Sequence, residues 1–369
     1  MTTLEFQYLT YTVLGCAFLV SYGLGFIAQR SHFCTMGAIA DVFLMQDWGR
    51  AFQWMIAANL CTLGFGVLCV SAQIDPVQTL YFSTKWYWAS TVVGGFLFGM
   101  GMVLSSGCGL KSIVRAGGGN LKSVVVLIVM GTFAFMTIKG VFAVVRVATL
   151  DQLFINISGG ATWGGLFGLT SNTQWGWLAI SLSLFFFCVL MGCKNARQVS
   201  VLGVGVGVGT LFVVIWWITG HLGFVPEHPD TLEAVFVASK SGKIEAFNFV
   251  GPVAYFLNWL EFYSDQSNVL STGVISVVGV FVGSLSSALL NSSYKREGFT
   301  QSDDLVFHLI GAALMGVGGV LALGCSVGQG ISGLSTLSLN ATSAIISIVL
   351  GAWSCLRLRS RQVSLAVCS

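Results

Sequence analysis

The sequence has few charged residues. Only 8% of its 369 residues are Asp, Glu, Lys or Arg, whereas a soluble domain is roughly a quarter charged. So few charges cannot cover a water-exposed surface, which excludes a soluble globular protein. Instead, 55% of the residues are hydrophobic and the mean hydropathy is +0.84. Several apolar runs reach the ~20 residues that a helix needs to cross a ~30 Å hydrocarbon core, so we predict an all-α, polytopic membrane protein.

Several functional signatures are also absent. No Gly-x-x-x-x-Gly-Lys-[Ser/Thr] motif is present, which excludes ATP hydrolysis by this chain. The basic residues are scattered rather than gathered in a stripe, which argues against nucleic-acid binding. No polar linker separates the apolar runs, so we expect one membrane domain over residues 1–369. The first run, Leu9 to Ile27, lacks the basic start of a signal peptide, and we expect it to be retained as a span.

The apolar runs and the basic residues between them predict a topology. Together with short re-entrant helices, nine crossings are expected at about residues 9–28, 51–72, 86–105, 122–146, 175–192, 200–220, 269–290, 304–323 and 337–356. Basic loops follow the first, third and fifth spans, and the positive-inside rule places such loops in the cytoplasm. The amino terminus is then outside and the carboxyl terminus cytoplasmic. This topology requires Phe247 to Phe262 to make no net crossing, so we predict an interfacial or re-entrant segment there.

Two segments of the chain share one pattern. Gly99 to Cys108 and Gly316 to Cys325 both read G-x-G-x-V-L-x-x-G-C, with six identities in ten positions at an offset of 217 residues (325 − 108). We therefore predict two related halves, at about 1–174 and 175–369. In the predicted topology the two Gly-Cys segments enter the membrane from opposite sides, which indicates an inverted-topology repeat. Transporters with this symmetry bind substrate near the midplane, between discontinuous helices.

Glycine is concentrated around both Gly-Cys pairs. It frees backbone amides that can contact a ligand, but irregular backbone at membrane depth persists only beside protein or a polar cavity. We therefore expect a cavity or pore whose backbone donors come from the loop glycines Gly107, Gly109, Gly324 and Gly328. The alternative is that the glycines only let helices pack closely, as small residues do in membranes.

Three of the ten cysteines lie at breaks between apolar runs: Cys34, Cys108 and Cys325, each next to Gly, Ser or Thr. No C-x-x-C motif or His pair accompanies them, so we expect no metal site and no cofactor. A neutral thiol is a weak donor with a polarizable sulfur, which suits contact with a soft anion such as thiosulfate. Thiolates also carry persulfide sulfur, so a redox relay is an alternative.

At three places the sequence resembles the YeeE/YedE, or sulfur-transport, family of bacterial inner-membrane proteins. The resemblance rests on Gln29-Arg30-Ser31-His32-Phe33-Cys34, on Gly107-Cys108 with Arg115-Ala116-Gly117, and on Gly324-Cys325-Ser326-Val327-Gly328-Gln329-Gly330. It implies an hourglass of nine membrane helices, with short helices entering from both sides and the three cysteines along the conduction path. It also implies a cytoplasmic TusA-like sulfur carrier protein as a partner. The sequence departs from the family pattern at His32, Ala40, Lys111 and Gly118, which bears on the identity of the solute.

The leading hypothesis is a transporter, not an enzyme, that imports thiosulfate or a related small sulfur-containing anion. Its expected substrate pathway comprises the three cysteines and four polar residues, namely Cys34, Cys108, Cys325, Lys111, Arg115, Gln329 and Arg30. The basic members either contact the anion or only fix the topology at helix ends. One alternative is a membrane sulfurtransferase, or persulfide relay, that delivers sulfur to a cytoplasmic carrier protein. Another is a structural membrane subunit.

Overall fold

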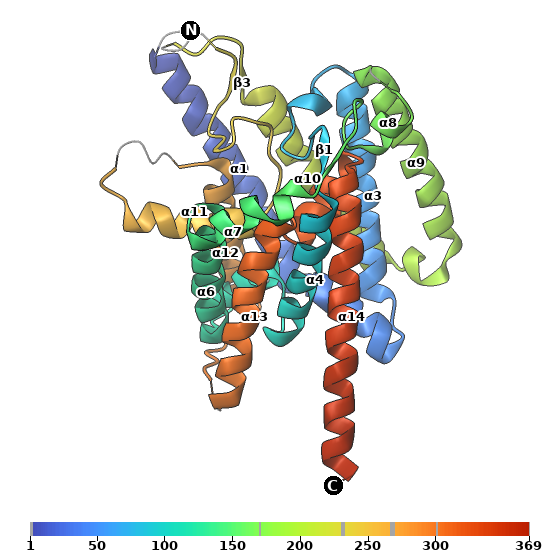
Figure 1. Cartoon of the computed structure of the whole chain (residues 1–369), viewed down its shortest axis with the longest axis vertical. Coiled ribbons are helices and arrows are strands. Elements are labelled where there is room, and N and C mark those ends of the chain that lie inside the picture. The colour runs from blue at the N-terminus through green and yellow to red at the C-terminus, as the bar shows by residue number, and fades with distance from the viewer. Residues whose placement is uncertain (1–2, 170, 230–232, 266–269, 300–301, 369) are drawn as a thin grey trace.

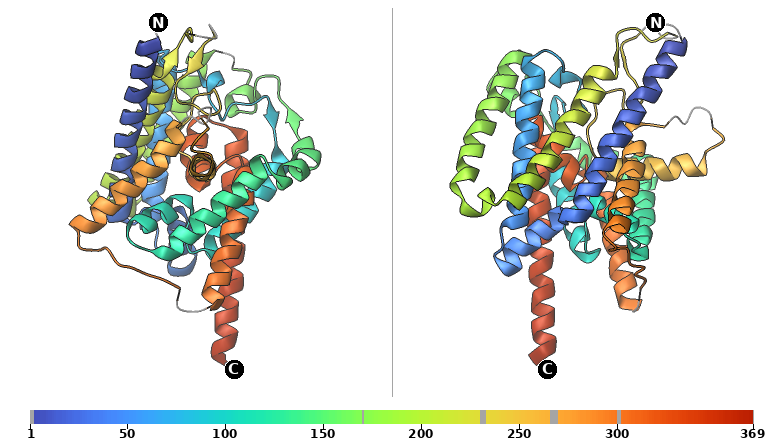
Figure 2. Two further views of the ribbon diagram at one scale, coloured as in Figure 1. Left: turned by 90° about the vertical axis from the view of Figure 1, so that its left-hand side faces the viewer. Right: turned by 180° about the vertical axis from the view of Figure 1, so that it is seen from behind.

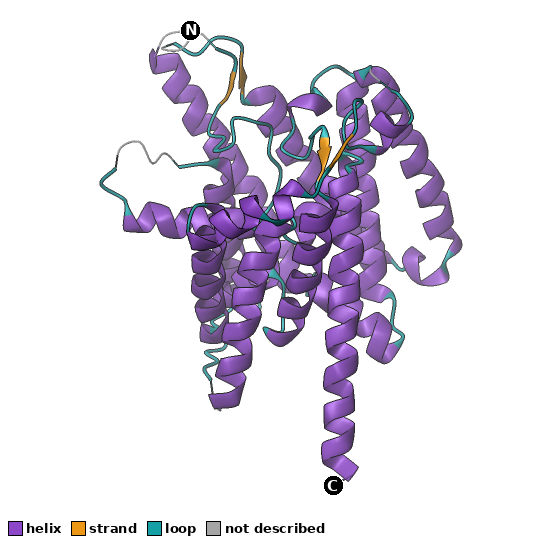
Figure 3. Ribbon diagram, in the orientation of Figure 1, coloured by secondary structure: helices purple, strands orange, loops and turns teal. Residues whose placement is uncertain are grey.

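The computed structural model describes residues 3–169, 171–229, 233–265, 270–299 and 302–368. The fold is almost entirely helical (Figures 1 and 3). Two short antiparallel ribbons accompany the helices: β1 (Lys85–Trp86) pairs with β2 (Ile155–Asn156), and β3 (Phe224–Val225) pairs with β4 (Val235–Phe236). The all-α prediction is confirmed.

Within the described residues, nine helical segments are long and apolar enough to cross a membrane. Each contains one long helix: α1 (Thr3–Ser31), α3 (Gly49–Val70), α4 (Trp88–Leu104), α6 (Leu121–Ile138), α9 (Asn172–Gly192), α10 (Val199–Trp217), α12 (Thr272–Leu290), α13 (Ser302–Leu321) and α14 (Leu339–Cys368). Large apolar side chains such as Phe185 and Phe186 of α9 are exposed, because lipid tails and not water surround such a face. The predicted multi-pass membrane architecture is confirmed.

One predicted span is too long. The apolar run over 122–146 predicted a single crossing, but α6 ends at Ile138 and a separate helix, α7 (Val141–Ala148), follows. Between them Gly140 has an extended backbone, with φ −98° and ψ −153°, which turns the chain away from the α6 axis. Both sides of the turn are apolar, so hydropathy alone does not detect it.

Short helices connect the long ones. Four of them lie next to Cys34, Cys108 or Cys325: α2 (Thr35–Ala40), α5 (Gly109–Gly117), α11 (Val250–Glu261) and the π-helical turn η6 (Gly328–Gly333). The others are η1 (Asp41–Met45), η2 (Pro76–Gln78), η3 (Leu150–Gln152), α8 (Trp163–Leu166), η4 (Lys194–Arg197) and η5 (Ile218–Leu222). With 12 residues, α11 is about 18 Å long and cannot span a ~30 Å core. In Figure 1 it runs across the long helices, which agrees with the absence of a net crossing by this segment.

Helices α4 and α13 cross closely through glycine. A Cβ on Gly101 would lie 2.6 Å from the Gly311 carbonyl oxygen, and one on Gly318 would lie 2.6 Å from the Gly94 carbonyl oxygen. These four glycines are two pairs at the offset of the Gly-Cys repeat, since 311 − 94 and 318 − 101 both equal 217. Gly94 corresponds to Gly311 and Gly101 to Gly318. Gly101 contacts Gly311, and in the same way Gly318 contacts Gly94. Reciprocal contacts of this kind are expected where two helices cross antiparallel at a two-fold axis.

The remaining long helices pack in matching pairs. Helix α1 packs on α12 as α10 packs on α3, and α14 packs on α4 as α6 packs on α13. Each pair joins one helix before α9 with one after it, so the two halves of the sequence interlock. The start of α1 and the end of α14 lie at opposite ends of the molecule (Figures 1 and 2). The packing fits two inverted units, while the boundary near residue 174 stays a prediction.

Candidate functional site

All three predicted cysteines follow the same kind of turn. Two residues before each cysteine the backbone is left-handed, with φ of 53°, 57° and 60° at His32, Ser106 and Leu323. The amide of the residue directly before each cysteine donates to the carbonyl five residues earlier, at N to O distances of 3.2, 2.9 and 2.8 Å. This hydrogen bond closes a Schellman motif at the end of a long helix. Each cysteine therefore stands between the end of one helix and the start of a short one.

The cysteine sulfurs face the starts of the short helices. The Cys34 Sγ accepts a hydrogen bond from the Gly37 amide (3.4 Å), and the Cys325 Sγ accepts one from the Gly328 amide (3.2 Å). Cys108 is the N-cap residue of α5, but its thiol caps no amide there and lies next to the Cys34 thiol. The first amides of a helix have no partner within it and carry partial positive charge. Each cysteine thus lies where negative charge is stabilised.

The structure brings the three cysteines together in the interior. Cys34 is 5% exposed and Cys108 and Cys325 are 0% exposed. A Cβ on Gly109 would lie 3.6 Å from the Phe249 Cβ, and the Phe249 amide lies against the Cys325 thiol. Cys108 and Cys325 are close enough to interact electrostatically. The starts of α2, α5, α11 and the segment after Cys325 therefore meet at one place.

Asn248 ties α11 to the Cys325 turn. Its Oδ1 accepts hydrogen bonds from the Cys325 amide (3.2 Å) and from the Phe249 amide (2.8 Å). Because Oδ1 is committed to two backbone amides, Nδ2 is the side-chain donor that remains. Sequence reasoning missed this residue. The sequence feature that could have indicated it is an amide side chain between two phenylalanines, Phe247 and Phe249, which are both buried.

Three buried polar atoms near the cysteines have no hydrogen-bond partner among the described residues. They are the hydroxyl oxygens of Thr35 and Ser326, which directly follow Cys34 and Cys325, and Oε1 of Gln329. Gln329 is only 1% exposed. Buried polar groups are nearly always hydrogen bonded to protein, water or ligand. These three atoms therefore mark a place where water or a polar ligand is expected to bind. Gln329 was predicted as a pathway residue, and the two hydroxyls were not.

Lys111 and Arg115 lie on the α5 side of the cluster. The half-buried Lys111 ammonium is close enough to interact electrostatically with Cys34, Cys108 and Arg115. Arg115 donates from Nη1 to the Ser106 carbonyl at 3.0 Å, which fastens α5 to the turn before Cys108. A cation beside two thiols attracts an anion, so the site is electropositive on this side.

Arg50 was not predicted as a pathway residue, yet it stands near the same group. Its Nε lies 2.8 Å from Oδ2 of Asp41, and it is close enough to Lys111 for electrostatic repulsion. Arg30, which was predicted, is exposed at the end of α1. The structure therefore places Lys111 beside the thiols, Arg115 and Arg50 next to Lys111, and Arg30 at the surface.

The predicted loop glycines hold the turns. The Gly107 and Gly324 amides close the two Schellman turns, and the Gly328 amide bonds to sulfur. Gly109 is the first residue of α5, where a helix amide has no internal partner. Their role as donors to a ligand stays a prediction.

One extra residue distinguishes the second turn from the first. The cysteines are 217 residues apart (325 − 108), whereas α6 and α14 begin 218 residues apart (339 − 121). The wider winding of η6 accommodates the extra residue. Single π turns of this kind often accompany functional sites.

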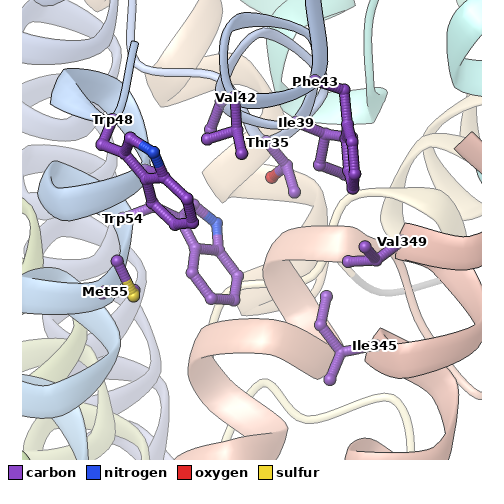
Figure 4. Close-up of a pocket in the computed structure, with 11 residues that line it drawn as sticks. Thr35, Ile39, Val42, Phe43, Trp48, Trp54, Met55, Ile345 and Val349 are labelled. Carbon is purple, nitrogen blue, oxygen red and sulfur yellow. The ribbon is translucent and has the colours of Figure 1, made fainter. Parts of the chain in front are cut away.

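A cavity also lies beside α2, but its walls are apolar. Its volume is about 260 Å³ and Figure 4 shows it open between α2, η1, α3 and α14. The residues labelled there are Thr35, Ile39, Val42, Phe43, Trp48, Trp54, Met55, Ile345 and Val349. Such walls suit a lipid chain and not a small anion. Among the described residues, no group of three or more His, Cys, Asp or Glu side chains is placed to hold a metal ion.

The contact between the first two thiols makes a direct prediction. Mild oxidation with copper phenanthroline is expected to join Cys34 to Cys108, because the two thiols are neighbours in the interior. Peptide mass spectrometry of the purified protein measures the bond. Cys69, buried elsewhere in α3, is the control and stays reduced. Oxidised protein without a peptide linking Cys34 and Cys108 contradicts the geometry.

Long apolar helices, short helices that meet inside, and a buried polar cluster at their starts define a membrane transporter. The sequence model of the family described as Sulphur transport matches residues 30–354. The chain therefore belongs to the Sulphur transport family, and the resemblance to YeeE/YedE proteins is confirmed.

Curated relatives extend over most of the chain. It is 26% identical to the thiosulfate transporter TsuA of Escherichia coli K12 over 339 residues, which cover 90% of each protein. It is 23% identical to the thiosulfate transporter TsuA of Spirochaeta thermophila, over 91% of this chain and 96% of the relative. A shorter match, 33% identical over 105 residues, is to the probable transporter YedE of Salmonella typhimurium LT2. It covers 28% of this chain and 24% of the relative.

Proposed function

We propose that this protein imports thiosulfate or a closely related sulfur anion across the bacterial inner membrane. The observation that carries the proposal is the meeting of Cys34, Cys108 and Cys325 at the starts of short helices in the interior. The names of two relatives that match over most of the chain support the choice of thiosulfate. The amino terminus is proposed to lie outside and the carboxyl terminus in the cytoplasm.

The chemistry of the cluster suits this solute. Thiosulfate carries a soft terminal sulfur and three oxygens, so it can accept weak bonds from thiols and stronger ones from amides. Neutral thiols contact the soft sulfur without repelling the dianion, and helix-start amides balance its charge. The anion passes from Cys325 to the pair Cys108 and Cys34, and Lys111 draws it toward the cytoplasm. Weak contacts at several sites permit both binding and release.

Uptake of a dianion is opposed by the membrane potential. One charge moved across 100 mV costs about 2.3 kcal/mol, so a dianion moved against an inside-negative potential costs about 4.6 kcal/mol. Import therefore needs consumption of the anion inside, a coupled ion, or both. The cytoplasmic TusA-like sulfur carrier is proposed as the consumer, on the family resemblance alone.

A sulfurtransferase is the second candidate, because two neighbouring thiols can hand sulfur to one another. In that reaction the Cys34 thiolate attacks the outer sulfur of thiosulfate, the S–S bond breaks, and sulfite leaves with its electron pair. The Cys34 persulfide then forms. We propose transport without this step, so no sulfite is released.

Labelling at either sulfur separates the two functions. Proteoliposomes of the full chain are given thiosulfate labelled with ³⁵S at the outer or the inner sulfur, and uptake is measured over time. Intact import brings both labels inside at the same rate and leaves no label on the protein. Retention of only the outer sulfur, as a persulfide, establishes the sulfurtransferase instead. Inserted protein that accumulates neither label contradicts thiosulfate import.

A further inference from the structure

A cavity with several polar side chains in its wall lies against Asn248. Its volume is about 140 Å³ and we call it the outer cavity; its polar lining residues are Lys240, Ser241, Glu245, Asn248, Tyr255 and Ser271. Leu80, beyond the end of α3, also lines it, whereas Arg50 lies at the start of that helix. This volume is large enough for one small anion.

Asn248 connects the outer cavity to the cysteines. It lines the cavity and holds the Cys325 and Phe249 amides through Oδ1. An anion that leaves the cavity past Asn248 therefore next meets the Cys325 turn. The outer cavity and the Cys325 turn both lie against Asn248.

Glu245 is the acidic residue among those that line the outer cavity. Its Oε1 accepts hydrogen bonds from the Ser241 amide (3.2 Å), the Ser241 hydroxyl and the Ser239 hydroxyl (3.4 Å). Burial raises the pKa of Glu245 above its usual range. An ionised Glu245 in a cavity of this size repels a dianion, and a protonated one does not.

The other titratable groups around Glu245 come from three segments. Lys240 and Lys243 lie on its own loop; the Lys240 Nζ lies 5.9 Å from the centre of the Tyr255 ring of α11, and the Lys243 Nζ donates to the Phe82 carbonyl at 3.4 Å. Tyr81, from the segment after α3, and Tyr255 both interact electrostatically with Glu245. The start of α12 contributes only Ser271 and Gly273 to the cavity. Lys240, which lines the cavity, favours an anion there once Glu245 is neutral.

We propose that the outer cavity binds the sulfur anion together with a proton carried by Glu245. The proposal rests on the function proposed above. A proton from the outside solution neutralises Glu245, so the dianion enters the cavity without repulsion from that carboxylate. When the anion has moved on to Cys325 and the cavity rehydrates, the proton returns to the outside solution and Glu245 is ionised again.

The test measures uptake against external pH. Full-length protein in liposomes with a fixed internal pH takes up ³⁵S-thiosulfate, and the wild-type rate is expected to rise as external pH falls. The sign follows from the raised pKa: lower pH increases the protonated fraction, which changes by about tenfold per pH unit above the pKa. Glu245→Gln keeps a neutral acceptor for Ser241, and its uptake is expected to be independent of pH.

Two further variants keep the test decisive. Glu261→Gln removes an exposed carboxylate at the end of α11, and its pH profile is expected to match the wild type. Glu245→Asp restores a titrating group and, with it, the dependence on pH. A Glu245→Gln profile that still follows the wild type overturns the proton site while thiosulfate transport stands. No uptake by the wild type at any pH overturns both proposals.

Discussion

Replacing Cys325 with Ala is expected to lower thiosulfate uptake at least about tenfold, which corresponds to ~1.4 kcal/mol, while the protein still folds. The Cys325 thiol lies at the junction of the Gly328, Val327 and Phe249 amides. It is proposed to be the first thiol that an anion meets on the way from the outer cavity. Alanine removes both the donor and the polarizable surface at this point. Uptake of ³⁵S-thiosulfate per inserted protein measures the loss.

Stability does not explain this loss, because the structural effect of the change is small. A thiol removed from a helix start costs roughly one N-cap interaction, ~1 kcal/mol. Cys69→Ala is the matched control, because Cys69 is equally buried but lies near the far end of α3. It is expected to transport at the wild-type rate. If Cys325→Ala is inserted as well as the wild type and takes up thiosulfate at the wild-type rate, the pathway does not run past the cysteines.

The sequence predicted the cysteine cluster because two of its members stand in a repeated motif. Gly107-Cys108 and Gly324-Cys325 repeat in the chain, and the topology assigned them to opposite sides. Asn248 could not be found in this way, since it meets Cys325 across 77 residues and follows no motif. The outer cavity was missed for the same reason. Its residues come from Leu80 after α3, from the loop before α11, from α11 itself and from the start of α12.

Hydropathy predicted the long helices well and the short ones poorly. A helix of six residues such as α2 is less than two turns long, so no periodicity distinguishes it from a loop. The turn at Gly140 went undetected because apolar residues continue on both sides of it. The features that create the site are therefore local backbone reversals, which average hydropathy does not record.

Gly101→Leu is expected to reduce the yield of folded protein at least about tenfold, since overpacking alone costs ~1–3 kcal/mol. A Cβ at this position would lie 2.6 Å from the Gly311 oxygen and 2.8 Å from the Met315 nitrogen. Both are backbone atoms of α13, so no side chain can rotate away. The measurement is the monodisperse fraction in detergent by size-exclusion chromatography. Gly318→Leu is expected to have the same effect, because a Cβ there meets the α4 backbone in the same way.

Gly203→Leu in α10 is the control for this prediction. It makes the same substitution within a long apolar helix, but a Cβ there meets nothing within 4 Å. Leucine also has the higher helix propensity, by up to ~1 kcal/mol, so this variant is expected to fold at least as well as the wild type. Normal yields from both α4 and α13 variants contradict a close glycine crossing. If Gly101→Leu and Gly318→Leu both reduce the yield of folded protein and Gly203→Leu does not, the fold depends on the close two-fold contact between α4 and α13.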